Sequence, residues 1–286
     1  CKYVLIVNND GGILNDCEKL NIQLSDLTSK TDINLQNTIS EILDDSLFED
    51  LDILGPEVKD LEEKLCLYTG SKHCVTVSSG TDSLLVALMA LGVGAGDEVI
   101  TVPYTWISTA EVISLLGAKP VFVDIRSDTW NMDETRLELA ITEKTKAIMP
   151  VSIYGQCSDM DAINAIAEKY NLPVIEDAAQ SFGSKIRNRL SCSFGDVAAW
   201  SFCQDKIIST GGEGGIVATN DRAIFESMWS FKDHGKDVCA PRSISAIPNK
   251  FVYRHVRFGT NYRMMEMQAA IGRIQLERLE MTLAGR

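Results

Sequence analysis

The chain has 286 residues, of which 45% are hydrophobic, so it can bury the core of one large or two smaller domains. Its formal net charge of −13 at pH 7 argues against sequence-independent binding of nucleic acid, because such binding needs a basic surface. It does not exclude an anionic substrate, since a local site can oppose the net charge. No run of about 18 apolar residues occurs, so no membrane-spanning helix is predicted.

The eight cysteines form no CxxC pair and no regular ladder, and several lie in apolar settings. This usage predicts buried thiols in a reducing compartment and indicates neither disulfides nor a metal site. The opening CKYVLIVNND has too short an apolar core for a signal peptide. We therefore expect a cytoplasmic protein and, because the chain begins with Cys1, a fragment of a longer one.

From about residue 51 onward, short β-branched runs alternate with helical stretches. LGPEVKDLEEKLCLYTG predicts a helix with Pro56 in its first turn and Gly70 at its end. Strands are expected in HCVTVSSG, DEVITVP, KPVFVDI, KAIMPVSI, LPVIEDA, DVAAWSF and GGIVATN, and further helices in TDSLLVALMALG, TWISTAEVISLLG and MDAINAIAEKYN. This alternation predicts an α/β fold with a mostly parallel sheet covered by helices on both faces.

The two ends of the chain differ from this middle part. Residues 1–24 contain one strand-like run and form an unassigned extension. The segment YRMMEMQAAIGRIQLERLEMTLAGR predicts one long amphipathic helix. The expected organisation is therefore the extension, a large domain over residues 25–262, and a long helix over residues 263–286 that leads to a missing C-terminal domain.

In parallel α/β sheets, ligands bind at the carboxyl ends of the strands. One candidate there is VSSGTDSL, in which Ser79, Gly80 and Thr81 follow a strand and open a helix. Their backbone N–H groups and the helix dipole could receive a phosphate. A plain turn with an N-cap explains the same residues equally well. Because the stretch is neither GxGxxG nor a Walker loop, dinucleotide and NTP sites lose support.

Three more candidates follow other strands. Trp106 could cover a planar ring with its indole face, although a core tryptophan is the commoner case. Asp177 closes a strand just before Gln180 and could hold a protonated ring nitrogen, or simply cap a turn. Lys206 stands in SFCQDKIISTGGEGG, five residues after Ser201 and before a glycine cluster, where a solvated lysine would be the ordinary interpretation.

Together these residues match the needs of one cofactor. Pyridoxal phosphate requires an amine for its aldehyde, an acid for its pyridine nitrogen, an aromatic lid and a phosphate cup. Successive loops supply all four in chain order, namely Gly80 and Thr81, Trp106, Asp177, Ser201, and Lys206. The sequence therefore predicts a pyridoxal-phosphate site at the carboxyl edge of the sheet.

From Leu24 to its end, the chain resembles the DegT/StrS nucleotide-sugar aminotransferases, which are fold type I pyridoxal-phosphate enzymes. The resemblance rests on LGPEVKDLEEKL, SSGTDSL, YTWISTA, KPVFVDI, EDAAQSFGS, SFCQDK, TGGEGG and GTNYRMMEMQAAIGRIQLERL in this order. It implies that Lys206 binds the cofactor covalently and shuttles a proton. It also implies that Asp177 keeps the pyridine nitrogen protonated, that Gln180 contacts the ring hydroxyl region, and that Trp106 stacks on the ring.

The same resemblance assigns the phosphate to Gly80, Thr81 and Ser201. Asn261, in GTNYRM, resembles the family asparagine that reaches the phosphate of the neighbouring subunit, which implies a homodimer with shared active sites. Relatives that dehydrate their substrate replace the lysine by histidine, so Lys206 favours aminotransfer. The implied reaction is ping-pong, with glutamate as the expected amino donor and a keto sugar of a nucleotide sugar as acceptor.

The sugar is less defined than the reaction. The stretch PVSIYGQCSDMDAINAIAEKYNLPVIEDAAQSFGS resembles enzymes that aminate C3 of a UDP-linked 3-keto-glucuronic acid derivative for surface polysaccharide or lipopolysaccharide. The part from SFCQDKIISTGGEGG onward is more similar to other branches, including those that aminate C4 of dTDP-, GDP- or UDP-linked 4-keto-6-deoxy sugars. A non-catalytic cofactor-binding relative is another alternative. A Rossmann oxidoreductase is a further alternative, but this sequence lacks the GxGxxG that such an enzyme carries after its first strand.

Overall fold

The structure, a computed structural model, describes residues 54–191, 193–239 and 254–285. The chain divides into two compact units, Cys1–Leu51 and Asp52–Arg286, and every described residue belongs to the second. The N-terminal extension predicted over residues 1–24 and the first part of the large domain predicted from residue 25 therefore lie outside the described residues.

The described strands follow the predicted β-branched runs. Those of the main sheet are β1 (His73–Val77), β2 (Glu98–Thr101), β3 (Lys119–Phe122), β4 (Thr145–Ile148), β5 (Ile175–Asp177), β8 (Val197–Ser201) and β9 (Gly215–Thr219). A separate hairpin consists of β6 (Lys185–Ile186) and β7 (Arg189–Leu190). Five of the seven main strands are wholly or half buried along their length, and β4 is buried except at Lys146, as expected for a sheet with helices on both faces.

The strand order is β1-β9-β8-β5 in one ladder and β3-β2-β4 in another. Two parallel bridges, from Ile148 to Val174 and from Val151 to Asp177, connect β4 to β5 and make the ladders continuous. Only β9, among these strands, runs antiparallel to both of its neighbours. The predicted mostly parallel sheet is therefore confirmed, and β2, β3, β4, β5 and β8 all end at the same edge.

The helices begin and end at residues with a local physical reason. Pro56 begins α3, and Gly70 ends it with a φ of 73°, a left-handed conformation that suits glycine. The hydroxyl of Ser79 accepts a hydrogen bond from the backbone of α4. The described helices are α3 (Pro56–Thr69), α4 (Gly80–Ala90), α5 (Ser108–Leu115), α6 (Glu134–Leu137), α7 (Met160–Tyr170), α8 (Arg222–Lys232), α9 (Glu266–Glu277) and α10 (Leu279–Ala284), with 3-10 turns η1 (Glu138–Ala140) and η2 (Ile153–Gly155).

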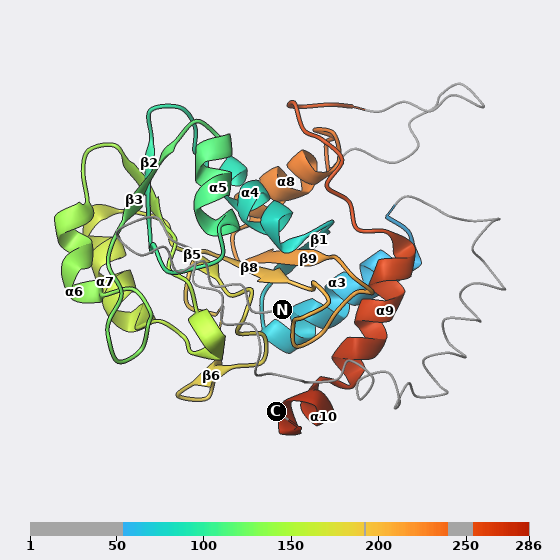
Figure 1. Cartoon of the computed structure of the whole chain (residues 1–286). Coiled ribbons are helices and arrows are strands. Elements are labelled where there is room, and N and C mark those ends of the chain that lie inside the picture. The colour runs from blue at the N-terminus through green and yellow to red at the C-terminus, as the bar shows by residue number, and fades with distance from the viewer. Residues whose placement is uncertain (1–53, 192, 240–253, 286) are drawn as a thin grey trace, which may run out of the picture. The chain divides into compact units, whose positions relative to one another are not determined.

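The core lies on both faces of the sheet. Alternate residues of β8 face opposite sides, so Val197 and Ala199 pack with residues of α4 and α8, whereas Ala198 and Trp200 pack with residues of α3 and α9. Figure 1 shows α4 and α8 on one side of β8 and β9 and α3 and α9 on the other. Both faces are thus covered, and the polar strand ends are left at the edge.

The C-terminal segment differs from its prediction. One continuous helix was expected over residues 263–286, but α9 ends at Glu277 and α10 begins at Leu279. At Arg278 between them, φ is −96° and ψ is 1°, outside the α-helical values. Leu279, the first residue after this break, is only 1% exposed. No described helix is long and apolar enough to cross a membrane.

Candidate active site

The predicted site residues gather at the edge where the parallel strands end. Asp177 is the last residue of β5, and Ser201 is the last residue of the neighbouring strand β8. Lys206 follows in the loop after β8. Because adjacent strands lie about 4.8 Å apart, these loops are neighbours in space.

Asp177 is a buried carboxylate with neutral hydrogen-bond donors. It is 4% exposed, and Oδ2 accepts from Oγ1 of Thr109 at 2.8 Å while Oδ1 accepts from the backbone N–H of Ala179 at 3.2 Å. Burial raises the pKa of Asp177, and these two donors and the nearby charge of Lys206 only partly oppose that effect. The ionised carboxylate would be stabilised by a further cation beside it.

Lys206 lies in a loop with a defined backbone. Its N–H donates to the carbonyl of Cys203 at 3.0 Å, and the N–H of Gln204 donates to the carbonyl of Gly212 at 2.9 Å. The ammonium group is 3.6 Å from Oδ1 of Asp205, and the side chain is 21% exposed. Lys206 is therefore not the freely solvated lysine of the ordinary interpretation.

The first turn of α4 lies against the end of β8. A Cβ added to Gly80 would be 2.5 Å from Cβ and 2.8 Å from Oγ of Ser201, so only glycine allows this approach. The hydroxyl of Thr81 lies 2.9 Å from that of Ser108 at the start of α5. Backbone N–H groups at the N-terminus of α4 and the hydroxyls of Thr81, Ser108 and Ser201 form a donor set suited to a phosphate.

The remaining predicted residues lie around this edge at different depths. Trp106 is 60% exposed, so the alternative of a core tryptophan is wrong. The side-chain Oε1 of Gln180 accepts a hydrogen bond of 2.9 Å from the N–H of Tyr154. Asn261 is exposed, and its Oδ1 accepts from the N–H of Arg263 at 3.3 Å. Among the described contacts, none joins Asn261 to Lys206 or Asp177.

Two contacts of the candidate site residues were not predicted from the sequence. Thr109 donates to Asp177, and Tyr154 donates to Gln180. Thr109 lies in the TWISTA stretch, three residues after Trp106, so it could have been marked as a polar residue on the first turn of a site helix. Its partner is 68 residues away, and no local pattern carries that pairing.

The fold and the candidate residues at the carboxyl edge of the sheet agree with the expected class of protein, the fold type I pyridoxal-phosphate enzymes. Comparison with known proteins then gives the family. The chain belongs to the DegT/DnrJ/EryC1/StrS aminotransferase family, whose sequence profile matches residues 33–286. It is 48% identical over 232 residues to the UDP-2-acetamido-2-deoxy-3-oxo-D-glucuronate aminotransferase of Pseudomonas aeruginosa, a match that covers 81% of this chain and 61% of that protein.

Solved structures agree with this assignment. The aminotransferase from Psychrobacter cryohalolentis superposes with a TM-score of 0.81 at 43% identity, over 87% of this chain and 62% of that one. NtdA from Bacillus subtilis with bound cofactor PMP superposes with a TM-score of 0.75 at 33% identity, over 87% of this chain and 53% of that one. The fold is that of fold type I, as expected. The chain spans about three fifths of the length of the first relative and the first structure.

Proposed function

We propose that this chain forms the cofactor site of a pyridoxal-phosphate-dependent aminotransferase that acts on a keto sugar of a nucleotide sugar. The observation that carries the proposal is the buried carboxylate of Asp177 within electrostatic reach of Lys206, beside the close approach of Gly80 to Ser201. Family membership and the PMP-bound structural relative support the same cofactor.

The residues present fit the two ends of this cofactor. At one end, the first turn of α4 with Gly80, Thr81 and Ser201 would hold the phosphate. At the other end, the donors to Asp177 within the described part of the chain are neutral, so a protonated pyridine nitrogen would supply a cation directly beside it. The exposed indole of Trp106 is available to cover the ring.

When bound, the cofactor supplies an electron sink for the substrate carbon that exchanges its amine. Asp177 would hold the ring nitrogen proton and so keep that sink effective. The Nζ atom of Lys206 would hold the cofactor and would take and return the proton at the substrate carbon. Gln180 would contact the ring hydroxyl region, with its side chain oriented by the N–H of Tyr154.

A homodimer with shared sites is part of the proposal. Asn261 is exposed, and the carbonyl of the next residue, Tyr262, accepts a hydrogen bond from the N–H of Ser78, directly before the N-cap of α4. This segment therefore lies beside the start of α4. In a dimer that pairs these edges, Asn261 would reach the phosphate of the partner subunit's cofactor. A cytoplasmic location stays a prediction.

For the substrate, we favour amination at C3 of a UDP-linked 3-keto-glucuronic acid derivative, with glutamate as the donor. The support is the 48% identity to a relative named for a UDP-linked 3-oxo-glucuronate. Such an amino sugar would serve surface polysaccharide synthesis. Comparing UDP-linked 3-keto sugars with dTDP- or GDP-linked 4-keto-6-deoxy sugars as acceptors would separate this substrate from the C4 alternative.

The decisive experiment is borohydride reduction of the purified chain with pyridoxal phosphate, followed by mass mapping of the modified peptide. Modification at Lys206, and not at the buried Lys232, is the expected result. Modification elsewhere or nowhere in a folded protein would contradict the proposal. Glutamate should then convert the cofactor spectrum to that of its amine form, and a modified Lys206 without this conversion would favour the non-catalytic alternative.

A further inference from the structure

Three aromatic side chains meet beside the proposed cofactor site. Tyr104 follows β2, Trp130 follows β3, and Tyr154 follows β4. The ring centroids of Tyr104 and Trp130 are 5.1 Å apart, those of Tyr104 and Tyr154 are 6.3 Å apart, and the two tyrosine hydroxyls are 2.5 Å apart. Trp130 is 48% exposed and Tyr154 is 59% exposed. We call these three residues the aromatic platform.

The strand order places the platform next to the cofactor residues. Along the carboxyl edge, the order β3-β2-β4-β5-β8 gives Trp130, Tyr104, Tyr154, Asp177 and then Ser201. The N–H of Tyr154 donates to Gln180, which joins the two groups directly. With strands about 4.8 Å apart, the platform extends roughly 14 Å from Asp177, on the side opposite the proposed phosphate cup.

The backbone holds two of these aromatic residues in an unfavourable conformation. The φ angle is 63° at Trp130 and 54° at Tyr154, in the left-handed region that bulky residues rarely adopt. Such strain persists only where the surrounding structure imposes it, and it occurs most often at functional sites.

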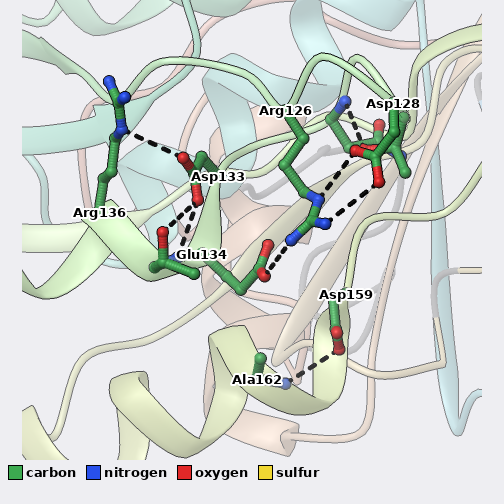
Figure 2. A network of polar contacts seen from close by, with 10 residues as sticks. Arg126, Asp128, Asp133, Glu134, Arg136, Asp159 and Ala162 are labelled. Carbon is green, nitrogen blue, oxygen red and sulfur yellow. Dashed lines mark hydrogen bonds and ion pairs between the residues drawn. The ribbon is translucent and has the colours of Figure 1, made fainter.

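The loop that carries Trp130 is closed by charged and backbone contacts. Figure 2 shows the guanidinium of Arg126 between the carboxylates of Asp128 and Glu134. The distances are 3.0 and 3.1 Å to Asp128 and 2.7 Å to Glu134. The N–H of Trp130 donates to the carbonyl of Arg126 at 2.9 Å. Arg126 thus contacts residues on both sides of Trp130 in this loop.

A buried asparagine connects the Trp130 loop to the Tyr154 turn. Asn131 is 3% exposed; its Nδ2 donates to the carbonyl of Gln156 at 3.1 Å, and its Oδ1 accepts from the N–H of Ile153 at 3.2 Å. These contacts lie on both sides of Tyr154 in η2. The two strained residues are therefore held by one rigid support, and the platform is preorganised for a ligand.

The pocket behind the Trp130 loop is a poor alternative site for the phosphates of that ligand. It has a volume of about 330 Å³ and is lined by Arg126 and Arg187, among other residues. Both guanidinium groups are paired with carboxylates, Arg126 as above and Arg187 with Asp161. The open aromatic faces at the sheet edge thus offer the better recognition chemistry.

We propose that the aromatic platform stacks the nucleobase of the nucleotide-sugar substrate. This inference rests on the proposed function, because the sugar must reach the cofactor between β5 and β8 while the rest of the substrate extends along the edge. A flat, uncharged base gains its binding free energy from stacking on aromatic faces. The hydrogen bond to Tyr154 raises the pKa of Tyr104 to about 12, so the hydroxyl of Tyr104 stays neutral at neutral pH.

The test uses the full chain loaded with pyridoxal phosphate and UDP as the probe. Calorimetry gives the Kd of UDP, and tryptophan fluorescence reports contact with Trp130. Trp130→Ala should raise this Kd by about 5- to 150-fold, the range found for alanine at base-stacking aromatics. Trp130→Phe should retain most of the affinity. Tyr170→Ala, which removes a 40% exposed tyrosine from α7, is the matched control and should leave the Kd unchanged.

Other outcomes would overturn the proposal that the platform stacks the nucleobase. An unchanged Kd in Trp130→Ala would contradict it, and so would a wild type that does not bind UDP. In either case the aminotransferase proposal stays intact if Lys206 still carries the cofactor. If N-acetylglucosamine 1-phosphate bound more tightly than UDP and quenched the tryptophan fluorescence more strongly, the platform would be assigned to the sugar instead of the base. A dimer that dissociates in Trp130→Ala would show that a second copy covers it.

Discussion

Two regions of the molecule bury an aspartate, and they treat its charge in opposite ways. At the carboxyl edge of the sheet, Asp177 is 4% exposed, and its hydrogen-bond donors among the described residues are neutral. After α8, Asp233 is 2% exposed and forms ion pairs with Nζ of Lys236 at 2.9 Å and with Nη1 of Arg263 at 2.5 Å. Burial acts to raise the pKa of Asp233, but these cations outweigh it and lower the pKa.

The difference indicates which aspartate serves the scaffold and which serves a ligand. The charge of Asp233 is satisfied within the chain, and a β-bridge from Asp233 to Asn261 ties two distant segments together. Among the described residues, the charge of Asp177 is opposed only in part, by two neutral donors and the nearby Lys206, which leaves it suited to a further cation. A buried group with a perturbed pKa at the end of a parallel strand is typical of a functional site.

The largest effect expected from this comparison is catalytic. Asp177→Asn keeps the shape of the side chain but removes the charge beside the proposed ring nitrogen. We expect the half-reaction with glutamate to slow by about 10²- to 10³-fold, as when one preorganised electrostatic group is removed. Stopped-flow absorbance would measure the rate, and borohydride mapping should still find the cofactor on Lys206. A near-normal rate would mean that another acid serves the ring.

The second effect is on stability, and it concerns Asp233. Asp233→Asn leaves Lys236 and Arg263 without their carboxylate; since these cations are 20% and 15% exposed, we expect a loss of about 2–3 kcal/mol in the free energy of unfolding. Urea denaturation would measure it. Glu226→Gln, which breaks an exposed pair with Arg222, should cost no more than about 0.5 kcal/mol. Equal losses would refute the structural role of Asp233.

The third effect is on cofactor binding, without any change of charge. In Gly80→Ala, the new Cβ would lie 2.5 Å from Cβ of Ser201, and the first turn of α4 would have to shift. Overpacking of this kind costs about 1–3 kcal/mol, so we expect the Kd of pyridoxal phosphate to rise by about tenfold. At Gly94, a Cβ meets nothing within 4 Å, so Gly94→Ala is the control for fluorescence titration. If both variants bind equally well, the phosphate lies elsewhere.

Much of the scaffold could be predicted from the sequence, because its strands are short β-branched runs between well-marked helices. The predicted candidate residues could be expected to lie near one another, since parallel strands bring their following loops to one edge, but their roles in a site stay predictions. The break at Arg278 could not be predicted, because the apolar periodicity continues through it and the burial of Leu279 is a tertiary effect.

The aromatic platform could not be predicted for a related reason. Tyr104, Trp130 and Tyr154 are each single aromatics in loops, and no local pattern requires a positive φ at the last two. Their arrangement depends on Asn131, which joins segments more than 20 residues apart. Long-range side-chain contacts of this kind become visible only in the folded chain.

The smallest effect is on the pH dependence of stability, and it should have opposite signs in the two regions. The pKa of Asp177 is raised above its ordinary value of 3.8, so the cofactor-free native state loses stability as the pH rises from that value through the folded pKa. Asp177→Asn removes this loss, so the free energy of unfolding of the variant should rise relative to that of the wild type over the same rise in pH.

The pKa of Asp233 is lowered, so its stabilisation is fully present above 3.8 and is lost as the pH falls through the folded pKa. The deficit of Asp233→Asn should therefore be largest near pH 7 and should shrink in acid. Each unit of difference between folded and unfolded pKa is worth about 1.4 kcal/mol, which urea denaturation between pH 3 and pH 7 can resolve. If both variants followed the same trend, the two aspartates would not differ in the way their contacts require, and the charges near Asp177, with Lys206 among them, would outweigh its burial.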